Sequence, residues 1–273
     1  MTSSMTERVD LFDSIYLHFS EQVLDLVRRE TFGVDIGQNS WVTADEYERF
    51  VPWLELAAGQ HVLEVASGSG GPALHLARLA SCRVTGIDAS ESGVATASRL
   101  ATEAGRADEV RFRVADANAR LPFEDASFDG LLCIDSMNHF PDRLAVLREW
   151  HRVLRPGRRA LFTDPVVVTG LATNDELALR SSVGLFVFAP DGLNAKLIER
   201  AGFRLVRQED VSENAAQVSR RWHQARASRR EELLRVETPD QYEGLQRFFA
   251  AVHRVTSERR LSRILYLAEK PAG

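Results

Sequence analysis

Scarce cysteine and the lack of long apolar runs exclude several classes of protein. Cys82 and Cys133 are the only cysteines among 273 residues, which excludes a disulfide-stapled scaffold and fits a reducing compartment. No apolar run approaches the ~20 residues that a membrane-spanning helix needs. The first ten residues are polar and do not resemble a signal peptide. We therefore expect a cytoplasmic protein with no membrane partner.

Lysine is almost missing as well. Lys196 and Lys270 are the only two, so arginine supplies nearly all of the 34 basic residues, which stand against 39 acidic ones. The net charge of −5 argues against a nucleic-acid partner, which usually requires a basic face. The seven histidines are scattered without metal-ligand spacing, so we expect no metal. These features favour a small-molecule partner and a monomer or homodimer.

Strands and helices alternate from residue 61 onward, which is typical of a parallel sheet covered on both faces. We expect an α/β fold with a Rossmann-like, seven-stranded, mostly parallel sheet. Helical periodicity at 9–29 and 44–57 predicts an N-terminal helical lid over 1–58, before a core over 59–273. Two further helical patterns, 213–236 and 240–259, predict a helical cap inserted at about 213–259. The seven expected strands are 61–66, 82–88, 110–115, 128–134, 159–163, 203–207 and 261–268.

A glycine-rich turn follows the first expected strand and leads into a helix. Gly68, Gly70 and Ala73 form a G-x-G-x-x-A pattern. Glycines allow a sharp turn and a close backbone approach to a ligand, and the helix start offers free N–H groups. The pattern suits the pyrophosphate of a nicotinamide dinucleotide as well as an adenosyl cofactor. Taken alone, this turn does not decide between a nicotinamide dinucleotide and an adenosyl cofactor.

Two acidic residues end the next two expected strands. Asp88 can accept hydrogen bonds from two ribose hydroxyls, a role that both cofactors would use. Asp116 ends the third strand, where a carboxylate suits an adenine amino group and nicotinamide enzymes require no acid. Acids at successive strand ends therefore favour a nucleoside site.

Several stretches in order resemble the class I S-adenosylmethionine-dependent methyltransferases. They are Val62–Gly71 (VLEVASGSGG), Val84–Ser90 (VTGIDAS), Leu121–Asp129 (LPFEDASFD) with Asp116 before it, Leu154–Gly157 (LRPG) and Ala201–Phe203 (AGF). The resemblance covers about 60–210 and lies with the small-molecule branch, which includes phosphoethanolamine and sarcosine/dimethylglycine methyltransferases. It implies an S-adenosylmethionine cofactor. It also implies that cofactor-binding residues are Val42, Thr43, Glu64, Ala66, Gly68, Gly70, Asp88, Ala89, Asp116, Ala117 and Ile134. The family often has glycine where Ala66 stands.

The end of the fourth strand faces the transferred methyl group in this family. Asp135 and His139 match the Asp-x-x-x-His spacing of the phosphoethanolamine enzymes, and the Gly37-Gln38-Asn39 loop resembles one that closes over their cofactor. The chain departs from them at Pro165 and in the apolar segment 183–190, which makes a phosphobase acceptor doubtful. An apolar or aromatic acceptor fits better. The acceptor-binding candidates are therefore Asp135, Trp41 and Phe186.

His139 is the candidate catalytic residue. A base is needed only where the acceptor atom carries a proton that must leave, and a positioned histidine contributes roughly 10²–10⁴-fold. The expected reaction is in-line transfer of a methyl group to an oxygen, nitrogen or carbon of a small organic acceptor. The alternatives are a non-catalytic cofactor-binding protein and a nicotinamide-dependent oxidoreductase.

Overall fold

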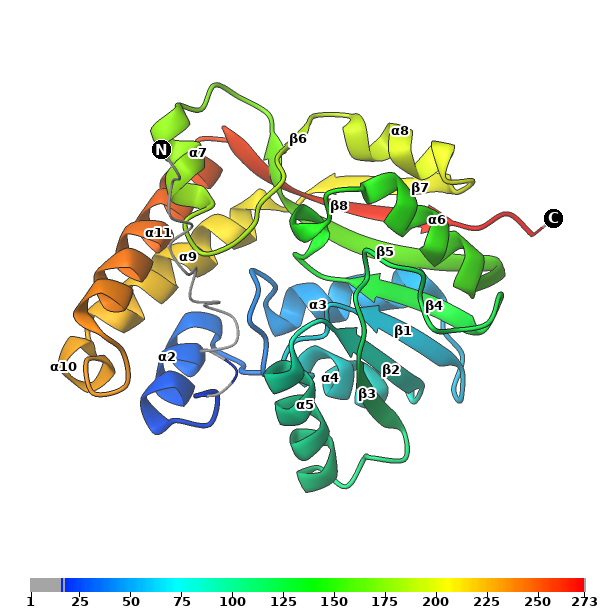
Figure 1. Ribbon diagram of the computed structural model, residues 1–273, viewed down its shortest axis with the longest axis horizontal. Coiled ribbons are helices and arrows are strands. Elements are labelled where there is room, and N and C mark those ends of the chain that lie inside the picture. The colour runs from blue at the N-terminus through cyan, green and yellow to red at the C-terminus, as the bar shows by residue number, and fades with distance from the viewer. Residues whose placement is uncertain (1–15, 17, 273) are drawn as a thin grey trace, which may run out of the picture.

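An eight-stranded sheet forms the centre of the computed structural model, which describes residue 16 and residues 18–272 (Figure 1). Its strand order is β3-β2-β1-β4-β5-β8-β7, with β6 paired to β5. The pairs among β1 to β5 are parallel, whereas β8 runs antiparallel to both β5 and β7. The strands are β1 His61–Val65, β2 Arg83–Asp88, β3 Val110–Val114, β4 Phe128–Cys133, β5 Leu154–Val168, β6 Ala189–Pro190, β7 Arg204–Asp210 and β8 Leu261–Glu269.

The expected Rossmann-like, mostly parallel sheet is confirmed, and two details differ. Strand β5 covers fifteen residues rather than five, because its start pairs with β4 at Leu154 and its far end pairs with both β6 and β8. That two-residue strand is the eighth and had no periodicity by which the sequence could show it. Its pairing anchors the end of the segment 183–190 beside the sheet.

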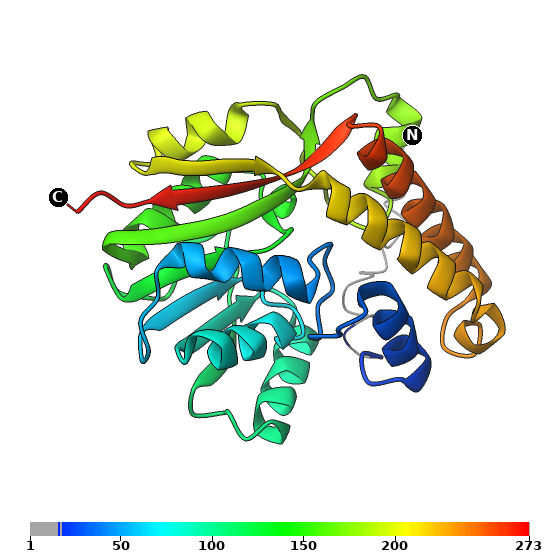
Figure 2. The same ribbon diagram turned by 180° about the vertical axis from the view of Figure 1, so that it is seen from behind.

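Helices cover both faces of the sheet, because successive strand residues point to opposite sides. Leu131 of β4 packs in the cluster that includes α6 and α8, whereas Leu132 packs in the cluster that includes α3 and α4. Figures 1 and 2 show these layers from opposite sides. The bounds are α3 Ala44–Phe50, η1 Val51–Leu54, α4 Gly71–Ala80, α5 Glu91–Glu103, η2 Met137–His139, α6 Arg143–Val153 and α8 Leu193–Arg200.

A second group of helices lies beyond one end of the strands. There α9 and α11 run side by side, with α2 and α7 beside them (Figures 1 and 2). Two apolar clusters join the group: Phe32 and Trp41 pack with Phe248 and Phe249, and Val27 packs with Leu233. The bounds are α2 Gln22–Phe32, α7 Asn174–Arg180, α9 Ser212–Ala227, α10 Arg230–Leu233 and α11 Pro239–Ser257.

Three expected helices have different bounds in the structure. The pattern at 9–29 lies partly outside the described residues; within them, 18–20 form a turn and α2 begins only at Gln22. The pattern at 44–57 divides into α3 and η1, and Glu55 ends η1 in a left-handed conformation. The pattern at 213–236 divides into α9 and α10, and the turn between them brings Leu233 into contact with the α2 cluster. The helical periodicity of the sequence predicted which faces of these helices are apolar. It did not predict where the helices are interrupted.

Among the described residues, no helix is both long and apolar enough to cross a membrane.

Candidate active site

The glycine-rich turn lies between β1 and α4 and is held by Asp88 at the end of β2. Asp88 Oδ2 accepts a hydrogen bond from the Gly68 amide at 2.8 Å, and its Oδ1 accepts one from the Ser90 amide at 2.9 Å. Gly68 has a φ of 51°, a left-handed conformation that glycine adopts readily. Ala66 also has a positive φ, 58°, which explains physically why glycine is common there in the family that the motif resembles.

The N-terminal segment lies directly on this turn. The Ser69 hydroxyl donates to the Gly37 carbonyl oxygen at 2.9 Å, and a Cβ on Gly71 would lie only 2.1 Å from the Ile36 carbonyl oxygen. Tyr16 covers the other side, since a Cβ on Gly68 would lie 2.7 Å from its phenolic oxygen. These contacts agree with the expected covering role of the loop, while the division into lid, core and cap stays a prediction.

Glu64 is a buried carboxylate beneath the same turn. Burial, together with the negative charge of Asp88, raises its pKa to about 8. Its Oε2 is buried and has no hydrogen-bond partner among the described residues. A buried acceptor without a donor suits a cationic amine brought by a ligand, such as the methionine ammonium of an adenosyl cofactor.

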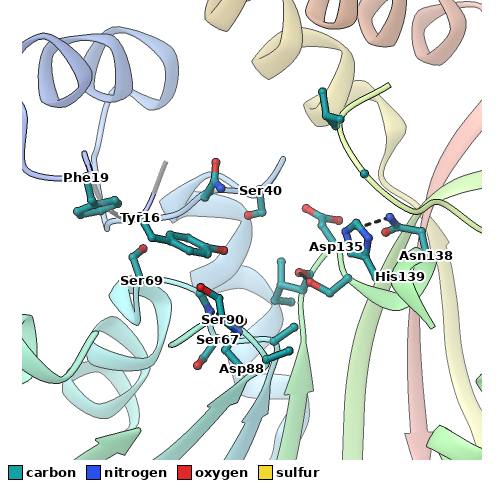
Figure 3. A pocket seen from close by; sticks show the side chains of 18 of the residues that line it. Tyr16, Phe19, Ser40, Ser67, Ser69, Asp88, Ser90, Asp135, Asn138 and His139 are labelled. Carbon is teal, nitrogen blue, oxygen red and sulfur yellow. Dashed lines mark hydrogen bonds between the residues drawn. The ribbon is translucent and has the colours of Figure 1, made fainter. Parts of the chain in front are cut away.

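On the opposite side, His139 ends the short helix η2, and Figure 3 shows it across the cavity from Asp88. Its Nδ1 lies 2.8 Å from the Leu185 carbonyl oxygen. A carbonyl can only accept, so Nδ1 carries the proton and Nε2 holds a lone pair in the neutral ring. The Asn138 amide lies 3.2 Å from Nε2, with the geometry of a donor. The ring is thus oriented so that Nε2 can take a proton.

Asp135 was expected to bind the acceptor, and the structure gives its carboxylate several protein partners. Oδ1 accepts from Arg263 Nε at 2.6 Å and from the Thr163 hydroxyl at 2.7 Å, and Oδ2 accepts from the Trp41 amide at 2.8 Å. Arg263 is fully buried and also pairs with Glu46 of α3 at 2.6 Å. Burial raises the pKa of Glu46, and Arg263 opposes that shift. Asp135 thereby holds β4, β8 and the N-terminal segment together.

Aromatic rings form the wall beside His139. Phe186 lies with its ring centroid 5.0 Å from that of His139, and Trp41 lies 6.2 Å from Phe248. Arg180, the last residue of α7, is fully buried among these rings. No sequence pattern had indicated a functional role for Arg180.

One cavity of about 1210 Å³ joins the two sides. Its walls include the acceptor-side residues His139, Asp135, Trp41 and Phe186. On the cofactor side, the predicted residues that line it are Ala66, Gly68, Asp88, Ala89, Asp116, Ala117 and Ile134. The structure places Val42, Thr43, Glu64 and Gly70 outside this lining, so their contact with a cofactor stays a prediction.

Comparison with known proteins places the chain in a family. The family described as "Methyltransferase domain" matches residues 63–162. The chain is 32% identical over 163 residues to the O-methyltransferase rstn1 of Aspergillus nomiae, covering 59% of this chain and 72% of that protein. The chain belongs to the class I S-adenosylmethionine-dependent methyltransferases.

Two bacterial members of this methyltransferase family are more similar in sequence. Methyltransferase GfsG of Streptomyces halstedii is 39% identical over 179 residues, covering 63% of this chain and 61% of GfsG. The 27-O-demethylrifamycin SV methyltransferase of Amycolatopsis mediterranei is 38% identical over 170 residues, covering 61% and 62%. The matched part of the chain thus spans about three fifths of the length of these two relatives.

A solved structure of similar shape belongs to a protein that is described with a different activity. The [4+2]-cyclase SpnF has 25% sequence identity and a TM-score of 0.73, covering 96% of this chain and 94% of that chain. The methyltransferase fold, including the helices beyond the sheet, is therefore shared with a protein described as a cyclase.

Three site residues escaped the sequence analysis as functional residues. Tyr16 falls within the helical pattern at 9–29, and that pattern gave no sign that its side chain lies against Gly68. Arg263 is the one charged residue of β8 besides its terminal Glu269, and a charge within a mostly apolar strand was a signal of a buried ion pair. Arg180 has no comparable signal, because two of the three rings around it, those of Trp41 and Phe248, come from segments distant in sequence. Among the described residues, no cluster of His, Cys, Asp and Glu could hold a metal ion.

Proposed function

We propose that this protein transfers a methyl group from S-adenosylmethionine to a hydroxyl oxygen of a small, largely apolar organic acceptor. The observation that carries the proposal is the single cavity, which extends from the glycine-rich turn to His139 and its aromatic wall. A cofactor at the turn and an acceptor at the wall would share one continuous cavity, as in-line displacement requires.

The residues at the turn fit the cofactor. Asp88 lies at the end of β2, accepts hydrogen bonds from the Gly68 and Ser90 amides and lines the cavity, where a carboxylate suits ribose hydroxyls. The Oε2 of Glu64, which has no hydrogen-bond partner among the described residues, suits the ammonium group, and Asp116 and Ala117, which line the cavity, would frame an adenine. When bound, the cofactor supplies a methyl group on an already activated sulfonium. The work left to the protein is to position the acceptor and exclude water.

His139 is the residue that we propose to take the acceptor's proton. Its Nδ1–H donates to the Leu185 carbonyl, which leaves the Nε2 lone pair directed toward Asn138. An acceptor hydroxyl that replaces the Asn138 amide as the donor to Nε2 would be poised to lose its proton as its oxygen forms the new bond to carbon. The product is a methyl ether, and the proton remains on Nε2 until solvent removes it.

Oxygen is favoured over nitrogen and carbon by two observations. Two of the relatives reported above carry names that specify O-methylation. A hydroxyl nucleophile also needs a base at the acceptor end, and His139 stands there. A permanently cationic acceptor is not favoured, because the Arg180 guanidinium already lies over the rings of Trp41 and Phe186.

The test is a panel of phenols and alcohols incubated with methyl-labelled S-adenosylmethionine, with products identified by mass spectrometry. We expect label on an oxygen. His139→Ala should lower turnover of the best acceptor by roughly 10²–10⁴-fold while S-adenosylhomocysteine binds unchanged. His75→Ala, on α4 beside Glu48 of α3 and outside the cavity lining, is the matched control and should turn over normally. Full activity in His139→Ala would eliminate it as the base.

A second candidate is cyclisation without methyl transfer, favoured by the similarity to SpnF along nearly the whole chain. It predicts product with unchanged mass and no consumption of S-adenosylmethionine, so the same panel separates the two. The nicotinamide alternative has no support in the family match. We further propose a cytoplasmic location, because Cys82 and Cys133 are both free and buried, and a small-molecule partner rather than a nucleic acid.

A further inference from the structure

Arg180 is a charged residue of the cavity wall that has hydrogen-bond donors without partners among the described residues. Its side chain is only 1% exposed, yet it lines the cavity. Its Nε and Nη1 are buried and have no hydrogen-bond partner among the described residues. Burial lowers its pKa to about 10, the direction expected for a cation removed from water without a bonded partner.

The nearby carboxylates do not supply that partner. Asp135 and Asp164 are the acidic groups whose charge acts on Arg180. Asp135 is paired with Arg263 at 2.6 Å, and Asp164 is paired with Arg143. Each of these carboxylates is thus already paired with another buried arginine, which leaves Arg180 as a third cation with no bonded anion among residue 16 and residues 18–272.

Aromatic rings hold the guanidinium in place. Its Cζ lies 4.8 Å from the Phe186 ring centroid, 5.3 Å from that of Phe248 and 5.7 Å from that of Trp41. Contacts of this kind stabilise the cation modestly and fix its position, but they fill none of its N–H donors. A buried arginine whose donors stay open is unusual, because a charge removed from water is normally paired or hydrogen-bonded.

Phe186 also links Arg180 to the proposed base. The same ring that lies under the guanidinium lies 5.0 Å from the His139 ring. A single small acceptor resting on Phe186 can therefore reach both residues. One of its groups would face Arg180 while its hydroxyl faces His139.

We propose that Arg180 binds a delocalised oxygen anion of the acceptor, so that the substrate is an apolar or aromatic hydroxy compound that also carries a carboxylate or an ionised enol. This inference rests on the proposed function, since it names the class of its acceptor. The planar guanidinium fork matches such an anion with two parallel hydrogen bonds. The pairing would neutralise the open cation and hold the apolar part of the acceptor on Phe186, Phe248 and Trp41.

The test is calorimetric titration of the full chain with two matched pairs of probes, with and without saturating S-adenosylhomocysteine. One pair is 1-naphthoate and 1-naphthamide; the other is 2-hydroxy-1,4-naphthoquinone, ionised at neutral pH, and its neutral 2-methoxy ether. We expect the anion of at least one pair to bind roughly 10-fold or more tightly than its neutral partner. Whichever pair shows the preference identifies a carboxylate or an enolate as the anion.

Arg180→Met should remove that preference while the neutral probes still bind, and Arg180→Lys should retain part of it. Arg28→Met is the matched control, because Arg28 lines the other side of the cavity and already pairs with Asp35, so the preference should stay. Equal binding of anion and neutral partner by the unmodified protein would overturn the inference, as would a preference that survives in Arg180→Met. S-adenosylhomocysteine binding is read separately, so its absence would count against the proposed function and not against the anion site.

Discussion

The cofactor side and the acceptor side of the cavity are built in different ways. On the cofactor side, Asp88 bonds to backbone amides at Gly68 and Ser90, within about one βα unit of the chain. On the acceptor side, Arg263 bonds to Asp135 and Glu46, which lie 128 and 217 positions away. The first side depends on local turns, and the second on charges brought together by the whole fold.

This difference assigns different tasks to the two sides. Backbone donors at strand ends suit a cofactor of fixed shape, because they depend little on side-chain identity. The acceptor wall, by contrast, comes from α7, the 183–190 segment, the Trp41 loop and α11. Buried ion pairs support two of these segments, because Arg143, paired with Asp164, donates to the Val187 carbonyl, and Asp135, paired with Arg263, accepts from the Trp41 amide. Changes in those segments can alter the acceptor while the cofactor side stays the same.

The largest effect should come from Arg263→Met, which leaves Asp135 and Glu46 buried without their shared cation. Removing one partner of a buried ion pair costs about 3–5 kcal/mol. We expect the free energy of unfolding, measured by denaturant titration, to fall by that amount. Arg204→Met is the matched control, since Arg204 is 62% exposed where it pairs with Glu269, and it should cost under about 1 kcal/mol. A similar small loss at Arg263 would show that the long-range ion pairs do not support the acceptor side.

The next effect concerns the pH dependence of stability at Glu64, whose pKa is raised to about 8 by burial. The folded protein holds this proton more tightly than the unfolded chain, whose carboxyl has a pKa near 4.5. The contribution of Glu64 to stability is therefore complete below about pH 4.5 and is lost as the pH rises toward 8. Glu64→Gln should remove a loss of roughly 3–4 kcal/mol between pH 5 and 8. Parallel pH profiles for both proteins would refute a raised pKa.

A smaller effect, confined to the cofactor side, is expected from Asp88→Ala. Loss of the hydrogen bonds between its carboxylate and ribose hydroxyls should weaken S-adenosylhomocysteine binding about 10- to 100-fold. The anion preference of the naphthalene probes should not change, since Arg180 lies on the other side. If the variant kept full affinity for S-adenosylhomocysteine, Asp88 would have no ribose role.

The cofactor side could be predicted from the sequence because its signals are local. The turn at Gly68 and the acids Asp88 and Asp116 each follow a strand whose apolar pattern is easily recognised, and parallel strands bring their ends together. Seven residues predicted there line the cavity. Glu64 was also found by its place in the motif, although its burial and raised pKa needed the structure.

The acceptor side could be predicted only in part. Asp135, His139, Trp41 and Phe186 were identified, but the partners that fix Asp135 could not be. No local pattern joins Arg263 of the last strand to Glu46 near the N-terminus, since only the antiparallel insertion of β8 brings them together. Arg180 could not be predicted for the same reason. Its unpaired N–H donors can be recognised only when the structure shows that Asp135 and Asp164 already pair with other arginines.

The most direct test of the central claim is calorimetric titration of the purified protein with S-adenosylmethionine, S-adenosylhomocysteine and NADH in parallel. The account predicts micromolar binding of the two adenosyl ligands and none of NADH. Binding of NADH alone, by a protein that is folded, would contradict it and would reassign the glycine-rich turn to a pyrophosphate.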